Sequence, residues 1–379
     1  MTAWQEIKRR FSNISVFSAA VFLLICIGWV LRFRQYFQDN SLWLDEAMLA
    51  LNIIQRDMFS LLQPLDYNQG APPAFLWAVK TAVQVFGNNE YSLRLIPLLS
   101  GCLVLFFIWS LSRKVTAKQG ALFAVLMAAF GHSLIFFSVQ VKQYSVDAAV
   151  TLFLYIFGLK LIAQDINKKQ LMMLALAGIA AVWISHTVIF TLPALALVLI
   201  FSHWRAGGWK GIRQFMPVLA AWLVNFICLY FLLYSSLNAN QYLMDYWREY
   251  FLPITWSAPF WVFGTLGGLF YSPGELAFSG PQIVIVILFL LGLIRLLFKR
   301  SAFGWIFSIS LVLTLAASGL GKYPFGGRMV LFLVPGLLIC AGEGLSVFAA
   351  IFKSKKMVSW TAFFIICVFL AYSPVLVSL

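Results

Sequence analysis

Long apolar runs are the feature that most constrains the fold of this chain. Several of them exceed the ~18 apolar residues that mark a membrane-spanning helix. Of the 379 residues, 62% are hydrophobic and only 11% are charged, against roughly 25% charged residues in an ordinary soluble domain. A water-soluble core could not bury so much apolar surface. The sequence therefore predicts an all-α polytopic membrane protein.

Hydropathy predicts about eleven transmembrane helices, with the N-terminus inside and the C-terminus outside. The first run follows a basic segment, as in a signal peptide, but it is too long for a signal sequence and no small-residue cleavage site follows it. We therefore expect it to be retained. The predicted spans are 15–31, 94–112, 120–138, 146–163, 170–185, 187–203, 214–235, 281–298, 302–318, 328–350 and 357–378.

The distribution of charge supports this orientation. Most of the 27 lysines and arginines fall in loops that the layout places inside, whereas Glu6 and Asp165 are the acidic residues assigned there. Membrane proteins show this positive-inside asymmetry. Because the net charge of +14 is spread over these short loops, we expect contact with membrane lipids and no nucleic-acid binding, which needs a basic patch on a soluble surface.

Two long loops lie on the predicted outer face. They belong to two modules, 1–203 and 204–379, of one continuous membrane domain. The first loop, 32–93, contains an amphipathic stretch at 46–63 and a short apolar stretch at 74–86. We expect both stretches to form juxtamembrane helices.

The second outer loop, 236–280, is rich in aromatic residues. Trp and Tyr prefer membrane interfaces, so the simplest interpretation is an aromatic belt. Aromatic rings on an outer face also stack on sugars or cradle a prenyl chain. The sequence leaves these interpretations open.

Asp45 and Glu46 form an adjacent acidic pair in a chain with only 13 acidic residues. Acidic groups in the first turn of a helix are stabilised by the helix dipole, and this effect alone could account for the pair. They would also suit catalysis on the outer face. Adjacent residues on a helix diverge by about 100°, so both cannot face one acceptor; the second would orient an arginine or a backbone amide.

Carboxylates and cations gather at the outer mouths of the predicted spans. There, a carboxylate can accept the proton of an attacking hydroxyl, and Arg or Lys can steady a phosphate leaving group. An oxygen-rich cluster could alternatively hold Mg²⁺ or Mn²⁺. The sequence therefore favours phosphoryl-sugar chemistry and leaves the metal requirement open, with no cofactor certain.

Four segments, in this order and spacing, resemble a known family. They are LWLDEAMLALNII (42–54), QGAPPAFLWAVK (69–80), EYSLRLIPLLSG (90–101) and SVQVKQYSVDAA (138–149), with weaker similarity in SGLGKYPFGGRMVLFLVP (318–335). Over about residues 15–200, the chain resembles the type C glycosyltransferases, which have the GT-C fold. By pattern it is similar to their bacterial protein O-mannosyltransferase and aminoarabinose-transferase branch.

The resemblance implies inverting transfer of a monosaccharide from a polyprenyl phosphate to an acceptor. Asp45 matches the position implicated as catalytic base, Glu46 is its acidic neighbour, and Asp147 lies where such enzymes keep a second acidic residue. The resemblance therefore implies these three as the catalytic residues, and it leaves open whether Asp45 or Glu46 is the base. One departure concerns the donor phosphate: Ala71 stands where the aminoarabinose branch has a phosphate-binding Lys before its Pro-Pro pair.

This departure shifts the expected phosphate contact to Lys142, Arg94 or Arg328. Glycines before Arg328 would let the backbone approach a ligand closely. His186 lies on a predicted outer hairpin between two spans. Helix capping or packing is the alternative explanation for this residue, beside substrate binding. The substrate-binding candidates are therefore Lys142, Tyr144, Arg94, Arg328, Tyr323 and His186.

Two other functions compete with sugar transfer. A transporter or flippase of lipid-linked sugars is the main alternative, although the sequence shows neither the internal repeat nor the midplane charge pair common in transporters. A polymerase or ligase would use a pyrophosphate-linked glycan. We expect a bacterial inner-membrane enzyme with a periplasmic site and a glycan, lipid or protein acceptor; the lack of a soluble C-terminal domain in the sequence tilts this slightly toward a glycan or lipid.

Overall fold

The computed structural model describes residues 16–162, 166–234, 241–271 and 280–351, and within them every regular element is a helix. Six helical segments are long and apolar enough to cross a membrane, or seven if one bent pair counts as a span. The six are α2 (Val16–Phe37), α5 (Glu90–Val115), α8 (Tyr144–Ile162), α10 (Val188–Arg213), α16 (Ala302–Gly319) and the segment Gly327–Ala350. The predicted all-α membrane class is confirmed.

The other predicted spans within the described residues also coincide with helices. They are α6 (Lys118–Phe130) with α7 (His132–Phe136) and η2 (Phe137–Val139), α9 (Lys168–Ile184), α11 (Met216–Leu229) with η3 (Tyr230–Tyr234), and α15 (Gly280–Phe298). The last span comprises η5 (Gly327–Leu333) and α17 (Val334–Ile351). The predicted span 357–378 lies outside the described residues, so the count of eleven and the orientation remain predictions.

Caps explain where the helices start. The side chain of Asn89 accepts a hydrogen bond from the backbone N–H of Ser92 at 2.9 Å, so α5 begins at Glu90, before the apolar run. Asn167 and Gln170 form a reciprocal capping box at the start of α9. Hydropathy alone does not register such polar caps.

A bend of 55° separates α6 from α7 at Gly131. A Cβ at this position would lie 2.6 Å from the carbonyl oxygen of Met127, so glycine fits the bend. Arg32 of α2 is completely buried beside it. Its guanidinium donates to the carbonyl oxygens of Gly28 and Ala128, at 3.0 Å each, and so satisfies a carbonyl near the broken end of α6.

The loop 32–93, predicted to be outer, contains α3 (Leu44–Gln55), η1 (Ser60–Leu62) and α4 (Pro73–Phe86). The expected helix at 46–63 is thus shorter, because the Asp57 carboxylate accepts from the N–H groups of Phe59 and Ser60, both at 2.8 Å, and starts a new turn. Asn52, a polar residue of the predicted amphipathic stretch, is buried, and its side chain accepts a hydrogen bond from the N–H of Asp66 at 2.9 Å.

The second loop predicted to be outer, 236–280, contains α13 (Gln241–Tyr246), η4 (Arg248–Tyr250) and α14 (Ala258–Tyr271). The sequence did not predict α14, whose Leu266 is buried and whose Trp261 and Phe263 pack against the core. Residues 235–240 and 272–279 of this loop lie outside the described residues.

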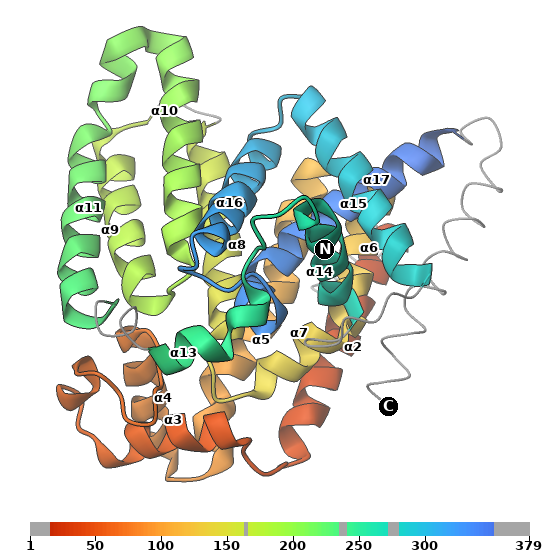
Figure 1. Cartoon of the computed structure of the whole chain (residues 1–379). Coiled ribbons are helices and arrows are strands. Elements are labelled where there is room, and N and C mark those ends of the chain that lie inside the picture. Colours follow the sequence, from red (N-terminus) through yellow and green to blue (C-terminus); the bar gives the residue numbers. More distant parts are fainter. Residues whose placement is uncertain (1–15, 163–165, 235–240, 272–279, 352–379) are drawn as a thin grey trace, which may run out of the picture.

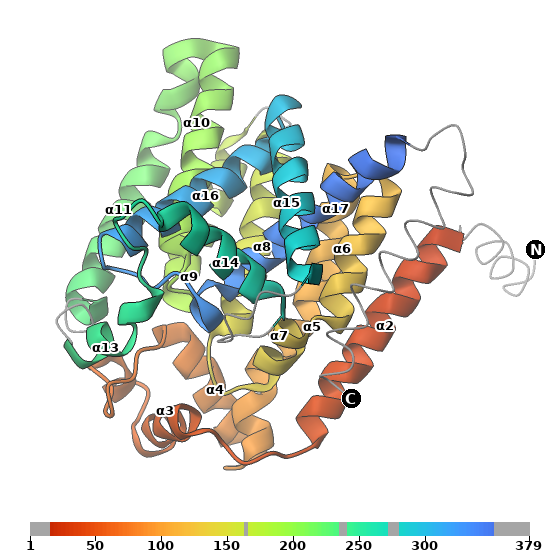
Figure 2. The same ribbon diagram turned by 45° about the vertical axis from the view of Figure 1, so that its right-hand side comes forward.

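Helices from the two long loops gather at one end of the bundle. In Figures 1 and 2, α3, α4 and α13 lie at the lower end, and the far end of α10 projects from the opposite end. Helix α8 lies inside the bundle and contacts α5, α10 and η5. Val146, in its first turn, belongs to one hydrophobic cluster with Leu49 and Ile53 of α3, so this turn reaches the end that carries α3.

Candidate active site

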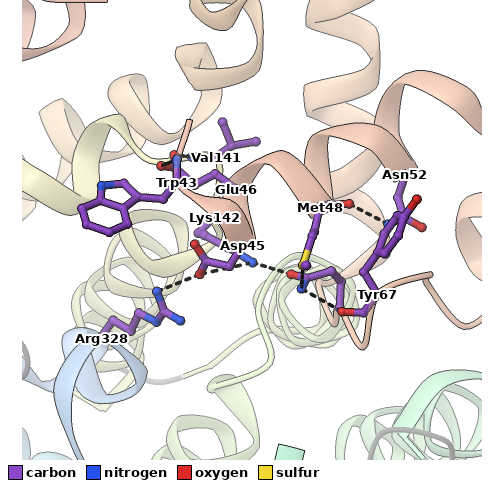
Figure 3. A network of polar contacts seen from close by, with 10 residues as sticks. Trp43, Asp45, Glu46, Met48, Asn52, Tyr67, Val141, Lys142 and Arg328 are labelled. Carbon is purple, nitrogen blue, oxygen red and sulfur yellow. Dashed lines mark hydrogen bonds and ion pairs between the residues drawn. The ribbon is translucent and has the colours of Figure 1, made fainter. Parts of the chain in front are cut away.

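The carboxylate of Asp45, in the first turn of α3, faces two cations. Its Oδ2 lies 2.7 Å from Nη1 of Arg328 and 3.8 Å from Nζ of Lys142 (Figure 3). Arg328 comes from η5, and Lys142 from the short segment between η2 and α8. Three segments distant in sequence thus meet at one partly exposed carboxylate.

Glu46 points away from Asp45 (Figure 3). Its side chain accepts hydrogen bonds from the backbone N–H of Val141 at 2.6 Å and of Trp43 at 3.1 Å. Burial raises the pKa of Glu46, although these two amides favour the charged form. Because Val141 precedes Lys142, the Glu46 bonds hold α3 against the segment that carries the lysine.

Lys142 is only 5% exposed. Its Nζ donates to Oε1 of Gln69 at 2.6 Å as well as pairing with Asp45. Burial lowers the pKa of Lys142 to about 8, while Asp45 opposes that shift. The site therefore contains a lysine whose charge is sensitive to pH near neutrality.

Arg328 lies over two aromatic rings. Its guanidinium carbon is 5.7 Å from the ring centre of Tyr144 and 5.5 Å from that of Trp247, within the range of cation–π attraction. Gly327, directly before it, has a φ of +51°, which favours glycine. A Cβ at Gly326 would collide with the ring of Tyr250, so both glycines help the η5 segment to fit here.

Four other candidate residues make their contacts elsewhere. Arg94 donates through Nη2 to the carbonyl oxygen of Asn40 at 2.7 Å and acts electrostatically on Glu46. The hydroxyl of Tyr323 donates to the carbonyl oxygen of Met329 at 2.7 Å. Arg94 thus supports the Glu46 side of the site, and Tyr323 stabilises the turn around Arg328.

Asp147 and His186 lie in a second buried polar region. Asp147 is near the start of α8, with the hydroxyl of Ser185 beside its carboxyl group. Its Oδ1 makes no hydrogen bond within the described part of the chain. His186 lies between α9 and α10, where burial lowers the pKa of its imidazole to about 4. The imidazole is therefore neutral at physiological pH.

The side chains around Asp45 do not fit a divalent cation. Asp45 already faces two positive charges, and both oxygens of Glu46 accept from backbone amides. Among the described residues, no group of three or more His, Cys, Asp and Glu side chains has an arrangement that could hold a metal ion. Arginine and lysine, rather than acidic ligands, dominate the charge around Asp45.

Sequence analysis missed two residues of this cluster. Gln69 begins the segment 69–80 but is not among the predicted candidates, although a polar residue directly before the Gly-Ala-Pro-Pro turn could have indicated a role in the site. Trp247 was recognised only as one aromatic residue among several in its loop. Its contact with Arg328 joins distant parts of the chain and has no local signature.

Comparisons with known proteins agree with the expected family resemblance. Residues 70–238 match a family model described as dolichyl-phosphate-mannose-protein mannosyltransferase. None of the curated proteins matches the sequence.

Several solved structures have a similar fold. ArnT from Cupriavidus metallidurans, bound to undecaprenyl phosphate, is 17% identical with a TM-score of 0.58; the match covers 86% of this chain and 60% of that one. An Archaeoglobus fulgidus oligosaccharyltransferase structure with Zn and sulfate is 15% identical with a TM-score of 0.60, covering 94% and 53%.

The archaeal oligosaccharyltransferase AglB from A. fulgidus, in complex with an inhibitory peptide and a dolichol-phosphate, is 12% identical. Its TM-score is 0.54, and the match covers 96% of this chain and 55% of that one. The present chain thus spans between half and two thirds of the length of these neighbours. At such identities the likeness establishes the fold.

Proposed function

We propose that this chain, which has the GT-C fold, is a membrane glycosyltransferase. It transfers a monosaccharide from a polyprenyl-phosphate donor to an acceptor hydroxyl, with inversion at the anomeric carbon. The family match and the lipid phosphates in neighbouring structures support this class of donor. The observation that carries the proposal is the contact of one carboxylate, Asp45, with two cations, Arg328 and Lys142.

Arg328 and Lys142 bind the donor phosphate. The planar guanidinium of Arg328 suits two phosphate oxygens at once, and Lys142 supplies a compact second charge. As the sugar–phosphate bond breaks, negative charge grows on the phosphate. Both cations then interact more strongly with the transition state than with the donor, which is the condition for accelerating the reaction.

Asp45 acts as the general base. The acceptor hydroxyl attacks the anomeric carbon from the face opposite the phosphate, forming the new glycosidic bond. The bond between the anomeric carbon and the phosphate oxygen breaks, and its electron pair leaves with the polyprenyl phosphate. The hydroxyl proton passes to Asp45. General-base catalysis of this kind typically contributes about 10²–10⁴-fold.

The existing ion pairs imply an order of events. Without donor, Asp45 is engaged by the same two cations that would bind the phosphate. An anionic phosphate that binds Arg328 and Lys142 competes with Asp45 for them and releases its carboxylate toward the acceptor. Donor binding thus precedes activation of the acceptor hydroxyl.

Other predicted residues have supporting roles in this proposal. Glu46 keeps Asp45 and Lys142 at a fixed separation, while Tyr144 holds Arg328 by its ring. Asp147 is a second acidic group that orients substrate from the α8 side. Arg94, Tyr323 and His186 shape the surroundings of the donor. The site lies on the periplasmic face of a bacterial inner membrane, and the acceptor is a glycan, a lipid or a protein.

A transfer assay with the full chain in lipid nanodiscs tests the proposal. A polyprenyl-phosphate monosaccharide with a labelled sugar is supplied together with isolated cell-envelope lipids, glycans and proteins. Covalent transfer of label to one fraction is expected, with inverted configuration. A parallel reaction with a pyrophosphate-linked glycan separates this activity from that of a polymerase or ligase. Movement of the donor across liposomes without any covalent product would overturn the proposal in favour of a flippase.

A further inference from the structure

A series of aromatic rings runs along α13 and η4. We call Tyr242, Tyr246, Trp247 and Tyr250 the outer aromatic ladder. Tyr242 and Tyr246 are stacked, with ring centres 6.5 Å apart and planes 22° apart. Trp247 contacts Tyr246 at 5.2 Å and Tyr250 at 5.3 Å, nearly edge-on in both cases. Tyr242 is 63% exposed and Tyr246 is 59% exposed, so the outer rings are available to a ligand.

The ladder is continuous with the candidate active site. Trp247 lies against the guanidinium of Arg328 at 5.5 Å, and Arg328 pairs with Asp45 at 2.7 Å. An elongated ligand on the ladder would therefore have one end directed toward Asp45.

Backbone hydrogen bonds attach the ladder to the segment that carries Arg328. The carbonyl oxygen of Tyr250 accepts from the N–H of Phe325 at 2.7 Å, and the N–H of Leu252 donates to the hydroxyl of Ser318 at 2.8 Å. The ring of Tyr250 also packs against Gly326. The aromatic rings and the cation are thus positioned together, as a binding site requires.

The chemistry of the ladder favours a sugar chain over a prenyl chain. Charged and exposed side chains alternate with its rings: Asp245, Arg248 and Glu249. A hydrocarbon chain would remove these charges from water without giving them a hydrogen bond, which is costly. A pyranose ring instead offers an apolar C–H face, which suits the negative face of an aromatic ring, and hydroxyl groups for the charged side chains.

A neighbouring segment provides the contrast. Ile254, Trp256 and Phe260 are strongly exposed, and no charged residue lies between positions 251 and 271. Such a surface suits lipid, since nothing charged must be desolvated. The two halves of the second outer loop therefore differ in the ligand that they can accept.

We propose that the outer aromatic ladder is a saccharide-binding subsite, which holds the sugar chain of a glycan or glycolipid acceptor so that its terminal hydroxyl reaches Asp45. The role as an acceptor site rests on the proposed function, whereas saccharide binding itself does not. The proposal therefore implies that the acceptor carries a sugar chain.

The test measures binding without requiring catalysis. The full chain in nanodiscs is titrated with fluorescently labelled, lipid-free oligosaccharides of hexoses, deoxyhexoses and N-acetylhexosamines. Tyr242→Ala and Tyr246→Ala should each weaken binding about tenfold, whereas Tyr242→Phe, which keeps the ring, should bind like the parent chain. Trp209→Ala is the matched control, because Trp209 is exposed near the C-terminal end of α10, and this end lies opposite to α13 (Figure 1).

The outcomes separate this inference from the proposed function. Saccharide binding that depends on the tyrosines would support the ladder even if the transfer assay failed. Absence of binding to every oligosaccharide, or equal binding by the Tyr242→Ala/Tyr246→Ala double variant, would overturn it. Weaker binding of the polyprenyl-phosphate donor, with unchanged binding of saccharides, would also overturn it by assigning the ladder to the lipid chain. Where transfer is measurable, Tyr242→Ala and Tyr246→Ala should raise the KM for the acceptor and leave the KM for the donor unchanged.

Discussion

Nη1 of Arg328 lies 2.7 Å from Oδ2 of Asp45, and the same guanidinium lies over the rings of Tyr144 and Trp247. The base and the phosphate-binding cation of the proposed mechanism therefore neutralise one another before substrate arrives. A phosphate must displace the carboxylate from the guanidinium, while the aromatic rings keep Arg328 in place. Removal of the Asp45 carboxylate is therefore expected to slow sugar transfer without weakening the binding of the donor.

Replacing Asp45 should separate donor binding from sugar transfer. In Asp45→Asn, transfer should fall by about 10²–10⁴-fold, because no general base remains. Affinity for polyprenyl phosphate should be retained or increased, because the competing carboxylate charge is gone. The two quantities are measured by single-turnover transfer and by lipid titration in nanodiscs. Asp66→Asn, which alters a more exposed carboxylate in the same loop, should leave both unchanged; full transfer activity in Asp45→Asn would refute the assignment of the base.

Arg328 should be poorly replaced by lysine. Lysine keeps the positive charge but loses the planar fork and its stacking on two rings, so Arg328→Lys should lower kcat/KM for the donor about tenfold or more. Arg328→Gln should lower kcat further, by about 10²–10³-fold, because charge on the departing phosphate is then less stabilised. Steady-state kinetics with varied donor provides the measurement. Arg113→Lys, at the C-terminal end of α5, is the control; equal losses in both lysine variants would argue against a specific phosphate contact.

The value of kcat/KM for the donor should decline as the pH rises through about 8. Burial lowers the pKa of Lys142 to about 8, so its ammonium group is present below that pH and is lost above it. The value of kcat/KM for an anionic donor should fall correspondingly. Lys142→Arg should remove this decline, since a guanidinium keeps its charge across the range. Identical alkaline limbs in the two pH profiles would show that Lys142 does not control donor binding.

The two backbone hydrogen bonds of Glu46 should matter mainly for stability and positioning. Hydrogen bonds to charged groups are worth about 1.5–3 kcal/mol. The two N–H groups bond to different oxygens of Glu46, and glutamine replaces one of these oxygens by an NH2 donor. Glu46→Gln should therefore lower the thermal unfolding temperature and reduce kcat, with little change in donor affinity. Thermal unfolding in detergent, followed alongside kinetics, distinguishes these effects. A variant with parental stability and no activity would instead place Glu46 at the chemistry.

Labelling of single cysteines tests the predicted orientation. Phe59, beside η1, and Trp209, near the end of α10, are both strongly exposed. In a cysteine-free background, Phe59→Cys should react with a membrane-impermeant maleimide in osmotically opened cells with an intact inner membrane. Trp209→Cys should react only after lysis. The reverse pattern would place the Asp45 site on the cytoplasmic face.

Sequence patterns predicted the parts of this fold that depend on local composition. Apolar runs identified the long helices, and a short apolar stretch identified α4. By contrast, α14 went unpredicted, because its Gly- and aromatic-rich sequence lacks a clear polar face. The end of α3 depends on hydrogen bonds that the Asp57 carboxylate accepts from backbone N–H groups, and hydropathy does not report these.

The residues that meet in the candidate site could be proposed from the sequence, but the contacts between them could not. Asp45, Lys142 and Arg328 were chosen from motifs, and the structure brings them into contact. The bonds that set their geometry join positions far apart, such as Glu46 to Val141 and Lys142 to Gln69. Such pairs have no sequence period, so only the folded backbone reveals them.

The buried Arg32 has a consequence for motion during turnover. Straightening the bend at Gly131 would withdraw the Ala128 carbonyl from the guanidinium and leave a buried charge less satisfied. At a cost of ~3 kcal/mol, a straightened form would make up roughly 1% of molecules or less. The segment 132–142, from α7 to Lys142, should therefore keep its conformation during substrate binding and product release. The rearrangement that donor binding requires is then expected in the side chain of Asp45, whose carboxylate leaves the guanidinium of Arg328.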